Sequence, residues 1–236
     1  MIKNRQIVLI YRCLCFIFIL AVLCVHIGIF IGEFSPGSIM YYTVQSNLLA
    51  LIMFGTLLYK STKVSSGGRK YIREDYYARF EVVCVMDLLL TLVVYWALLA
   101  PNSGSGYNLW NFDNLAVHLI TPLMCLADYI LFSEWGHMKY RDVYAVLIYP
   151  LCYVIFASIS GFMGYAYGIS PVDGKPIHFP YFFLDFDRIG FRASIYIAIL
   201  IAAFLLFAHT VYIFDKNIKK PVLISENKNM TIRSAK

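Results

Sequence analysis

Apolar residues along the chain gather in six long runs, each separated from the next by a shorter polar stretch. A helix needs about 20 mostly apolar residues to cross a bilayer, and each run reaches that length. The sequence therefore predicts six transmembrane helices, at residues 7–32, 39–59, 80–100, 114–133, 142–164 and 190–214. We expect one all-α, polytopic membrane domain over residues 1–214 and a polar tail over residues 215–236.

The composition supports a membrane protein and argues against a soluble one. Hydrophobic residues make up 60% of the 236 residues, charged residues make up 14%, and the mean hydropathy is +0.67. An ordinary soluble domain is about 45–50% apolar and about 25% charged. Because a domain of this size cannot bury so much apolar surface within itself, lipid must cover part of it.

The basic residues predict which way the helices cross the membrane. The net charge is +6, from 20 Lys and Arg against 14 Asp and Glu. Arg12 lies a turn or two inside the first predicted helix. The N-terminal segment, the second and fourth loops and the tail hold all the other Lys and Arg except Lys175, Arg188 and Arg192. Because cytoplasmic loops carry the excess of Lys and Arg, we expect both termini to be cytoplasmic. The basic surplus then faces anionic lipid and does not indicate nucleic-acid binding.

Polar residues at the start of the second predicted helix need an explanation. In the stretch YYTVQSNLLA, Thr43, Ser46 and Asn47 are spaced so that they share one face of the helix. A matching stripe of polar or small residues on the fourth predicted helix consists of His118, Thr121, Pro122 and Cys125. Thr43 and His118 each lie about 6 Å inside the outer end of their helices, at 1.5 Å per residue. If the two helices are neighbours, a hydroxyl and an imidazole can meet.

A hydroxyl beside a histidine is the minimum for nucleophilic acyl transfer. The imidazole of His118 would take the proton of Thr43 and later return it to the leaving group. Ser46 or Asn47 would support the site or stabilise the oxyanion. The spacing alone leaves a structural explanation open, because a membrane Thr often bonds the preceding turn and a buried His often bonds a neighbouring helix.

Other kinds of site find less support in the sequence. It contains no GxSxG, HExxH or Walker motif, and its six cysteines lie in apolar runs without a CxxC pair. We therefore expect neither a metal nor a cofactor. Asp87 and Asp128 lie inside predicted helices, where ionisable groups are costly. They could form a proton pathway with the histidines, or each could simply be paired across helices.

Four segments of the chain resemble the androgen-induced-gene family of six-helix membrane proteins and its bacterial relatives. They are Tyr41–Ala50, His118–Phe132, Tyr149–Gly161 and Phe179–Phe186. The resemblance implies hydrolysis of lipid esters of the type formed by fatty acids and hydroxy fatty acids. It also implies that Thr43 is the nucleophile and His118 the general base. Asp87 is not part of the family pattern.

The resemblance implies an intramembrane threonine hydrolase, of bacterial type and in the cell membrane. Its partners would be a lipid ester substrate and the surrounding membrane lipids. Asp185 or Asp187, in the last outward loop, is a candidate for orienting His118. The alternative function is a non-catalytic lipid- or solute-binding transporter that uses the same polar cluster, although the sequence lacks the internal repeats and broken helices that mark many transporters.

Overall fold

The fold is known from a computed structural model, which describes residues 4–30, 32, 34–63, 74–104, 106–133, 135–136 and 138–217. It is mostly helical, and six of its helices are long and apolar enough to cross a membrane. Most of the basic second loop and the predicted tail beyond Asn217 lie outside the described residues. The chain is thus a multi-pass α-helical membrane protein.

Three of the six spans are single α-helices and three combine shorter pieces. The single helices are α1 (Arg5–His26), α2 (Tyr42–Lys63) and α9 (Arg192–Asn217). The third span joins α3 (Glu74–Val94), the π-helical turn η3 (Tyr95–Leu99) and η4 (Ala100–Asn102). The fourth joins α4 (Phe112–Leu115), the π-helical turn η5 (Ala116–Ile120) and α5 (Thr121–Phe132). The fifth joins α6 (Asp142–Ala145) and α7 (Ile148–Phe162).

The helix ends differ from the predicted boundaries by up to six residues, and two of these differences have a clear physical cause. The first span was expected to reach residue 32, but α1 ends at His26 because Gly28 turns the chain with a φ of 80°. The tail was expected to begin at Asp215, but α9 continues to Asn217. Asp215 is buried there, and its carboxylate accepts hydrogen bonds from the backbone N–H groups of Gly136 and Met138.

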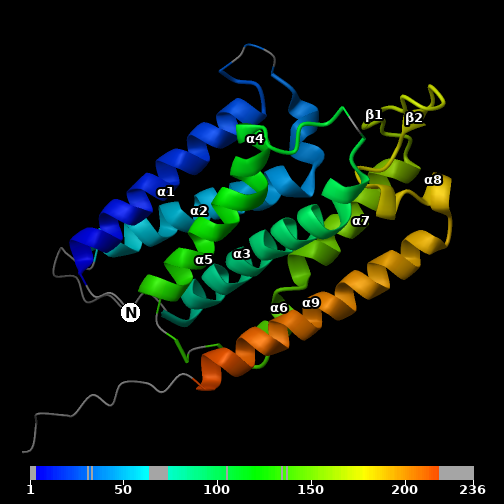
Figure 1. Ribbon diagram of the computed structural model, residues 1–236. Helices are drawn as coiled ribbons and strands as arrows, with labels where there is room; N and C mark the ends of the chain where they lie inside the picture. The colour runs from blue at the N-terminus through cyan, green and yellow to red at the C-terminus, as the bar shows by residue number, and fades with distance from the viewer. Residues whose placement is uncertain are drawn as a thin grey trace, which may run out of the picture.

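The helices α1, α2, α3 and α5 pack closely together, while α7 and α9 lie to one side of them (Figure 1). The core between the four helices is closely packed, with Ile19, Phe54, Leu88 and Cys125 at most 1% exposed. By contrast, α9 approaches the rest of the molecule mainly near its two ends, at η6 and α8 and at α6. This arrangement leaves room for a cavity beside the middle of α9.

Hydrogen bonds join several helix ends at one end of the bundle, where α1 begins and α9 ends (Figure 1). Arg5 at the start of α1 donates to the carbonyl of Ser61 near the end of α2, at 2.9 Å. Near this end Arg12 also forms a buried, bidentate ion pair with Asp128 of α5, at 2.9 and 3.0 Å. That this end faces the cytoplasm stays a prediction from the charge distribution.

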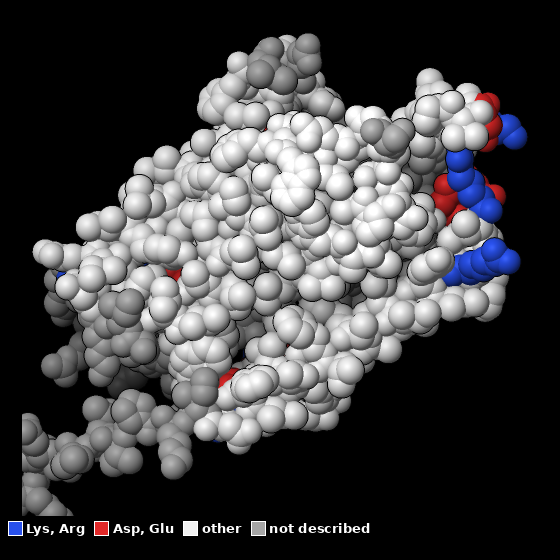
Figure 2. All heavy atoms as spheres, viewed as in Figure 1, with Lys and Arg blue, Asp and Glu red and all other residues white. Residues whose placement is uncertain are grey.

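The opposite end carries the irregular segments. These are η1 (Pro36–Met40), the antiparallel hairpin of β1 (Gly168–Ile169) and β2 (Pro176–Ile177), η6 (Phe182–Leu184) and α8 (Phe186–Ile189). Figure 2 shows Lys, Arg, Asp and Glu side chains gathered beside this hairpin, while the flank of the bundle in the same view is almost free of charge. An uncharged flank is what a surface in contact with lipid tails requires.

Candidate active site

Thr43 and His118 contact each other at the end of the bundle that carries the irregular segments. Thr43 is the second residue of α2, and His118 is the middle residue of η5. The Oγ1 of Thr43 lies 3.1 Å from the Nε2 of His118, and the two residues are only 7% and 8% exposed. This is the distance that a nucleophile needs from the base that activates it.

The hydrogen bond made by the second ring nitrogen of His118 determines whether Thr43 or His118 is the donor in their contact. Its Nδ1 is 3.0 Å from the backbone carbonyl oxygen of Asn114. Because a carbonyl can only accept, Nδ1 must carry the hydrogen, which leaves Nε2 of the neutral ring as an acceptor. The hydroxyl of Thr43 therefore donates to Nε2, and His118 is in the tautomer that a general base requires.

Tyr95 and Asn114 hold the imidazole of His118 in place. The ring of Tyr95 stacks on it, with centroids 3.7 Å apart and planes 19° apart. The amide of Asn114 donates to the hydroxyl of Tyr95 at 2.6 Å and to the carbonyl of Leu109 at 2.8 Å, while its Oδ1 accepts from Tyr107 at 3.0 Å. These bonds hold the Tyr95 ring against His118 and keep the backbone carbonyl of Asn114 in place as the acceptor for Nδ1.

The π-helical turn η5 joins the fourth span to α2. In this turn the N–H of Thr121 bonds the carbonyl of Ala116, five residues earlier. Pro122 has no N–H, so neither residue donates to the carbonyl of Val117. The amide of Asn47 donates to that carbonyl instead, at 3.1 Å. The helix irregularity thus creates an acceptor that ties α2 and η5 together beside the Thr43–His118 contact.

Ser46 and Asn47 lie beneath Thr43, and their donors are already used. Asn47 Nδ2 donates to the carbonyl of Thr43 at 2.8 Å as well as to Val117, and its Oδ1 can only accept. Ser46 Oγ lies 3.0 Å from the same Thr43 carbonyl and 2.9 Å from the hydroxyl of Thr91. This geometry holds the first turn of α2 and leaves neither residue a free donor for an oxyanion.

Asp87 and Asp128, the two carboxylates singled out within the predicted helices, are engaged by neighbouring side chains. Asp87 of α3 is fully buried and accepts from the hydroxyl of Tyr42 at 3.3 Å, next to Thr43 in the chain. Asp128 is paired with Arg12, near the other end of the bundle. Asp87 and Asp128 thus bond different residues. This favours the explanation that each acid is paired across helices over a proton pathway between them.

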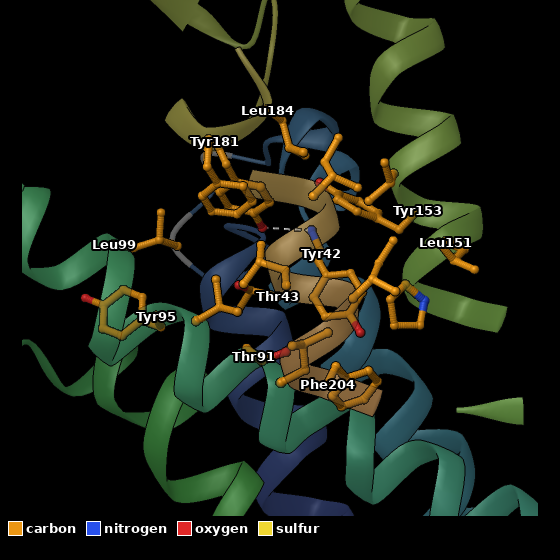
Figure 3. Close-up of a pocket in the computed structure, with 18 of the residues that line it drawn as sticks. Tyr42, Thr43, Thr91, Tyr95, Leu99, Leu151, Tyr153, Tyr181, Leu184 and Phe204 are labelled. Atoms are coloured by element: carbon orange, nitrogen blue, oxygen red, sulfur yellow. Dashed lines mark hydrogen bonds between the residues drawn. The ribbon is translucent and has the colours of Figure 1, made fainter. Parts of the chain in front are cut away.

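A largely apolar cavity opens beside Thr43, between α3, α7 and α9. Its empty volume is about 750 Å³, including the part that is open to the outside. Figure 3 shows Tyr181 and Leu184 at one end of the cavity, Thr91 and Phe204 at the other, and Thr43 between them. None of the described side chains that line it is charged. His118 is not in the lining, so Thr43 separates the imidazole from the cavity.

The loop before α9 lines one end of the cavity. Phe179 of this loop is 1% exposed and packs against Gly161 of α7, where an added Cβ would lie 2.5 Å from the Phe179 ring. The hydroxyl of Tyr181 then reaches the first turn of α2 and accepts from the backbone N–H of Tyr42, at 3.1 Å. A segment more than a hundred residues from Thr43 in the chain thereby contacts the turn that carries it.

The two loop carboxylates that were candidates for orienting His118 bond other residues in the structure. Asp185 caps α8 by accepting from the N–H of Arg188, and Asp187 pairs with His178 at 2.8 Å. The expectation that either orients His118 was wrong, because the carbonyl of Asn114 occupies that position. The sequence offered one relevant signal, since Pro122 four residues after His118 predicts an irregular helix there.

Comparison with known proteins adds no relative. No protein-family model, no curated protein and no solved structure matches the chain. No group of three or more His, Cys, Asp and Glu side chains that could hold a metal ion occurs in the described part of the chain.

Proposed function

We propose that the chain is an intramembrane threonine hydrolase of the androgen-induced-gene family, of bacterial type, that cleaves lipid esters. The observation that carries the proposal is the contact between Thr43 Oγ1 and the unprotonated Nε2 of His118 at the wall of the apolar cavity. Thr43 then lies between its base on one side and the space for a substrate on the other. The ester of a fatty acid with a hydroxy fatty acid is the substrate class that the family resemblance favours.

The chemistry follows from the positions of these groups. As His118 takes the hydroxyl proton, Oγ1 of Thr43 attacks the ester carbonyl, and the imidazolium returns the proton to the departing alkoxide. A water molecule then repeats the cycle on the acyl-Thr43 ester and releases the acid. The uncharged cavity suits the acyl chain, since apolar walls with a few placed hydroxyls are typical of ligand sites.

A non-catalytic lipid-binding transporter is the second candidate. The same cavity favours it, because an apolar chamber next to α9 accepts a lipid tail whether or not chemistry follows. This candidate gives no reason for the hydrogen bond from Nδ1 of His118 to Asn114, which prepares Nε2 as a base. The two candidates therefore differ in whether Thr43 is chemically reactive.

Labelling with a fluorophosphonate probe separates the two candidates. We expect purified protein in detergent to be labelled at Thr43, because the probe reacts with activated hydroxyls. Thr43→Ala and His118→Ala should abolish the labelling. Thr91→Ala is the matched control, since Thr91 lines the same cavity but bonds Ser46 and the Asp87 carbonyl, so this variant should still be labelled. A folded wild-type protein that never labels and hydrolyses no ester would support the transporter.

A further inference from the structure

The phenol of Tyr181 lies beside the reacting hydroxyl of Thr43. Both residues line the same cavity (Figure 3), and the phenol oxygen caps the backbone N–H of Tyr42, the residue before Thr43. That hydrogen bond uses a lone pair of the phenol oxygen, so the O–H can still donate to another group, and the hydroxyl of Thr43 is within its reach. An ester oxygen that binds in the cavity next to Thr43 can take over as the acceptor.

Its neighbours hold the Tyr181 ring in one orientation. It stacks on Phe183, with centroids 5.3 Å apart and planes 7° apart, and it meets Tyr41 edge to face. The hydroxyl of the nearby Tyr153 donates to the carbonyl of Met40 at 3.0 Å, so its hydrogen is already used. A donor that is fixed before the reaction is the arrangement that stabilises a developing negative charge most.

We infer that Tyr181 is a further catalytic residue, whose hydroxyl donates a hydrogen bond to the oxyanion formed when Thr43 attacks an ester. The inference rests on the proposed function. It gives the oxyanion a donor that Ser46 and Asn47 do not supply, because their own donors are already used. The first turn of α2 also places the positive end of the helix dipole at this point, which adds a favourable field for the oxyanion.

The step is balanced without any further reactant. Oγ1 of Thr43 forms a bond to the carbonyl carbon, its proton moves to Nε2 of His118, and the π electron pair moves onto the carbonyl oxygen. That oxygen accepts the Tyr181 hydrogen bond while it is negative. When the pair returns to re-form the carbonyl, the bond to the alkoxy oxygen breaks, and the alkoxide takes the proton from His118.

The acidity of Tyr181 fits this role. Burial raises the pKa of the Tyr181 phenol to about 12. The phenol therefore keeps its hydrogen at neutral pH and can act as a neutral donor. A phenolate at this position would repel the oxyanion.

The test compares Tyr181→Phe with wild-type protein in detergent. The substrate is p-nitrophenyl octanoate, and the rates are expressed per active site by titration with a fluorophosphonate, so that unfolded protein does not count. We expect kcat to fall about 100- to 1000-fold, as when one oxyanion donor is removed, with little change in KM. Tyr149→Phe is the matched control, because Tyr149 bonds Gln45 and does not line the cavity, and it should stay near the wild-type rate.

Two ketone inhibitors distinguish a catalytic donor from a residue that only caps α2. The hydroxyl of Thr43 adds to the carbonyl of a long-chain trifluoromethyl ketone and forms an oxyanion, whereas the matching methyl ketone mostly binds without this reaction. Tyr181→Phe should weaken the first about 100-fold and hardly change the second. Equal weakening of both ketones, or an unchanged kcat, would overturn the role of Tyr181 while leaving the hydrolase in place. A wild-type protein that neither turns over the ester nor forms the adduct would overturn the proposed function and this inference with it.

Discussion

Alanine in place of His118 is expected to lower kcat/KM for a lipid ester about 10²- to 10⁴-fold, the contribution of a well-placed general base. The imidazole accepts the Thr43 proton at 3.1 Å, and no other described side chain has a ring nitrogen at that hydroxyl. Thr43→Ala should remove covalent catalysis altogether, whereas Thr43→Ser should keep a measurable rate because it keeps the hydroxyl. Steady-state hydrolysis by detergent-solubilised protein gives these values.

His26→Ala is the matched histidine control for this prediction. His26 lies at the same end of the bundle as Thr43, but its Nδ1 faces the carboxylate of Asp113 at 2.8 Å and it makes no hydrogen bond to Thr43. We expect this variant to hydrolyse the ester at close to the wild-type rate. Equal losses for His26→Ala and His118→Ala would mean that the effect of His118 is structural.

Replacing Arg12 with methionine is expected to destabilise the fold by about 3–5 kcal/mol, the cost of breaking a buried ion pair. The guanidinium bonds both carboxylate oxygens of Asp128, whose side chain is fully buried. Without Arg12 the Asp128 carboxylate has no counter-charge, so α1 and α5 must separate or the acid must take up a proton. Denaturant titration in detergent micelles, followed by circular dichroism, measures the loss.

The double variant Arg12→Met with Asp128→Leu tests the reason for this loss. Since it removes both charges, it should recover most of the lost stability. If the double variant is as unstable as Arg12→Met alone, the unpaired carboxylate is not the cause. Ester hydrolysis per folded molecule should be unaffected in both, because Arg12 contacts Ser61 near the last turn of α2, whereas Thr43 is in its first turn.

The sequence predicted the six spans because lipid imposes the same requirement on each of them. A membrane helix needs about 20 apolar residues, so each span can be recognised without knowing its neighbours. The helix ends were less predictable: α1 stops at His26 because of one turn at Gly28, and α9 continues past Asp215 because backbone N–H groups of a distant loop satisfy that carboxylate. Both differences depend on local or tertiary contacts that the hydrophobic pattern does not contain.

Part of the candidate site could also be predicted. The spacing placed Thr43, Ser46 and Asn47 on one face, and equal depth suggested that Thr43 could meet His118. The donor to Val117 and the partner of His118 Nδ1 could not be predicted, because both follow from the π-helical turn η5. Tyr181 could not be predicted either, since its position depends on how the last loop folds over the bundle.

The most direct test of the central claim is to trap the acyl-enzyme and find which residue carries the acyl group. Wild-type protein is mixed with p-nitrophenyl octanoate, quenched in acid within the first turnover, digested and analysed by tandem mass spectrometry. We expect an octanoyl ester on the Thr43 hydroxyl, and no ester at that position in Thr43→Ala. Hydrolysis that proceeds at the wild-type rate in Thr43→Ala, or an acyl group found on another residue, would contradict the claim.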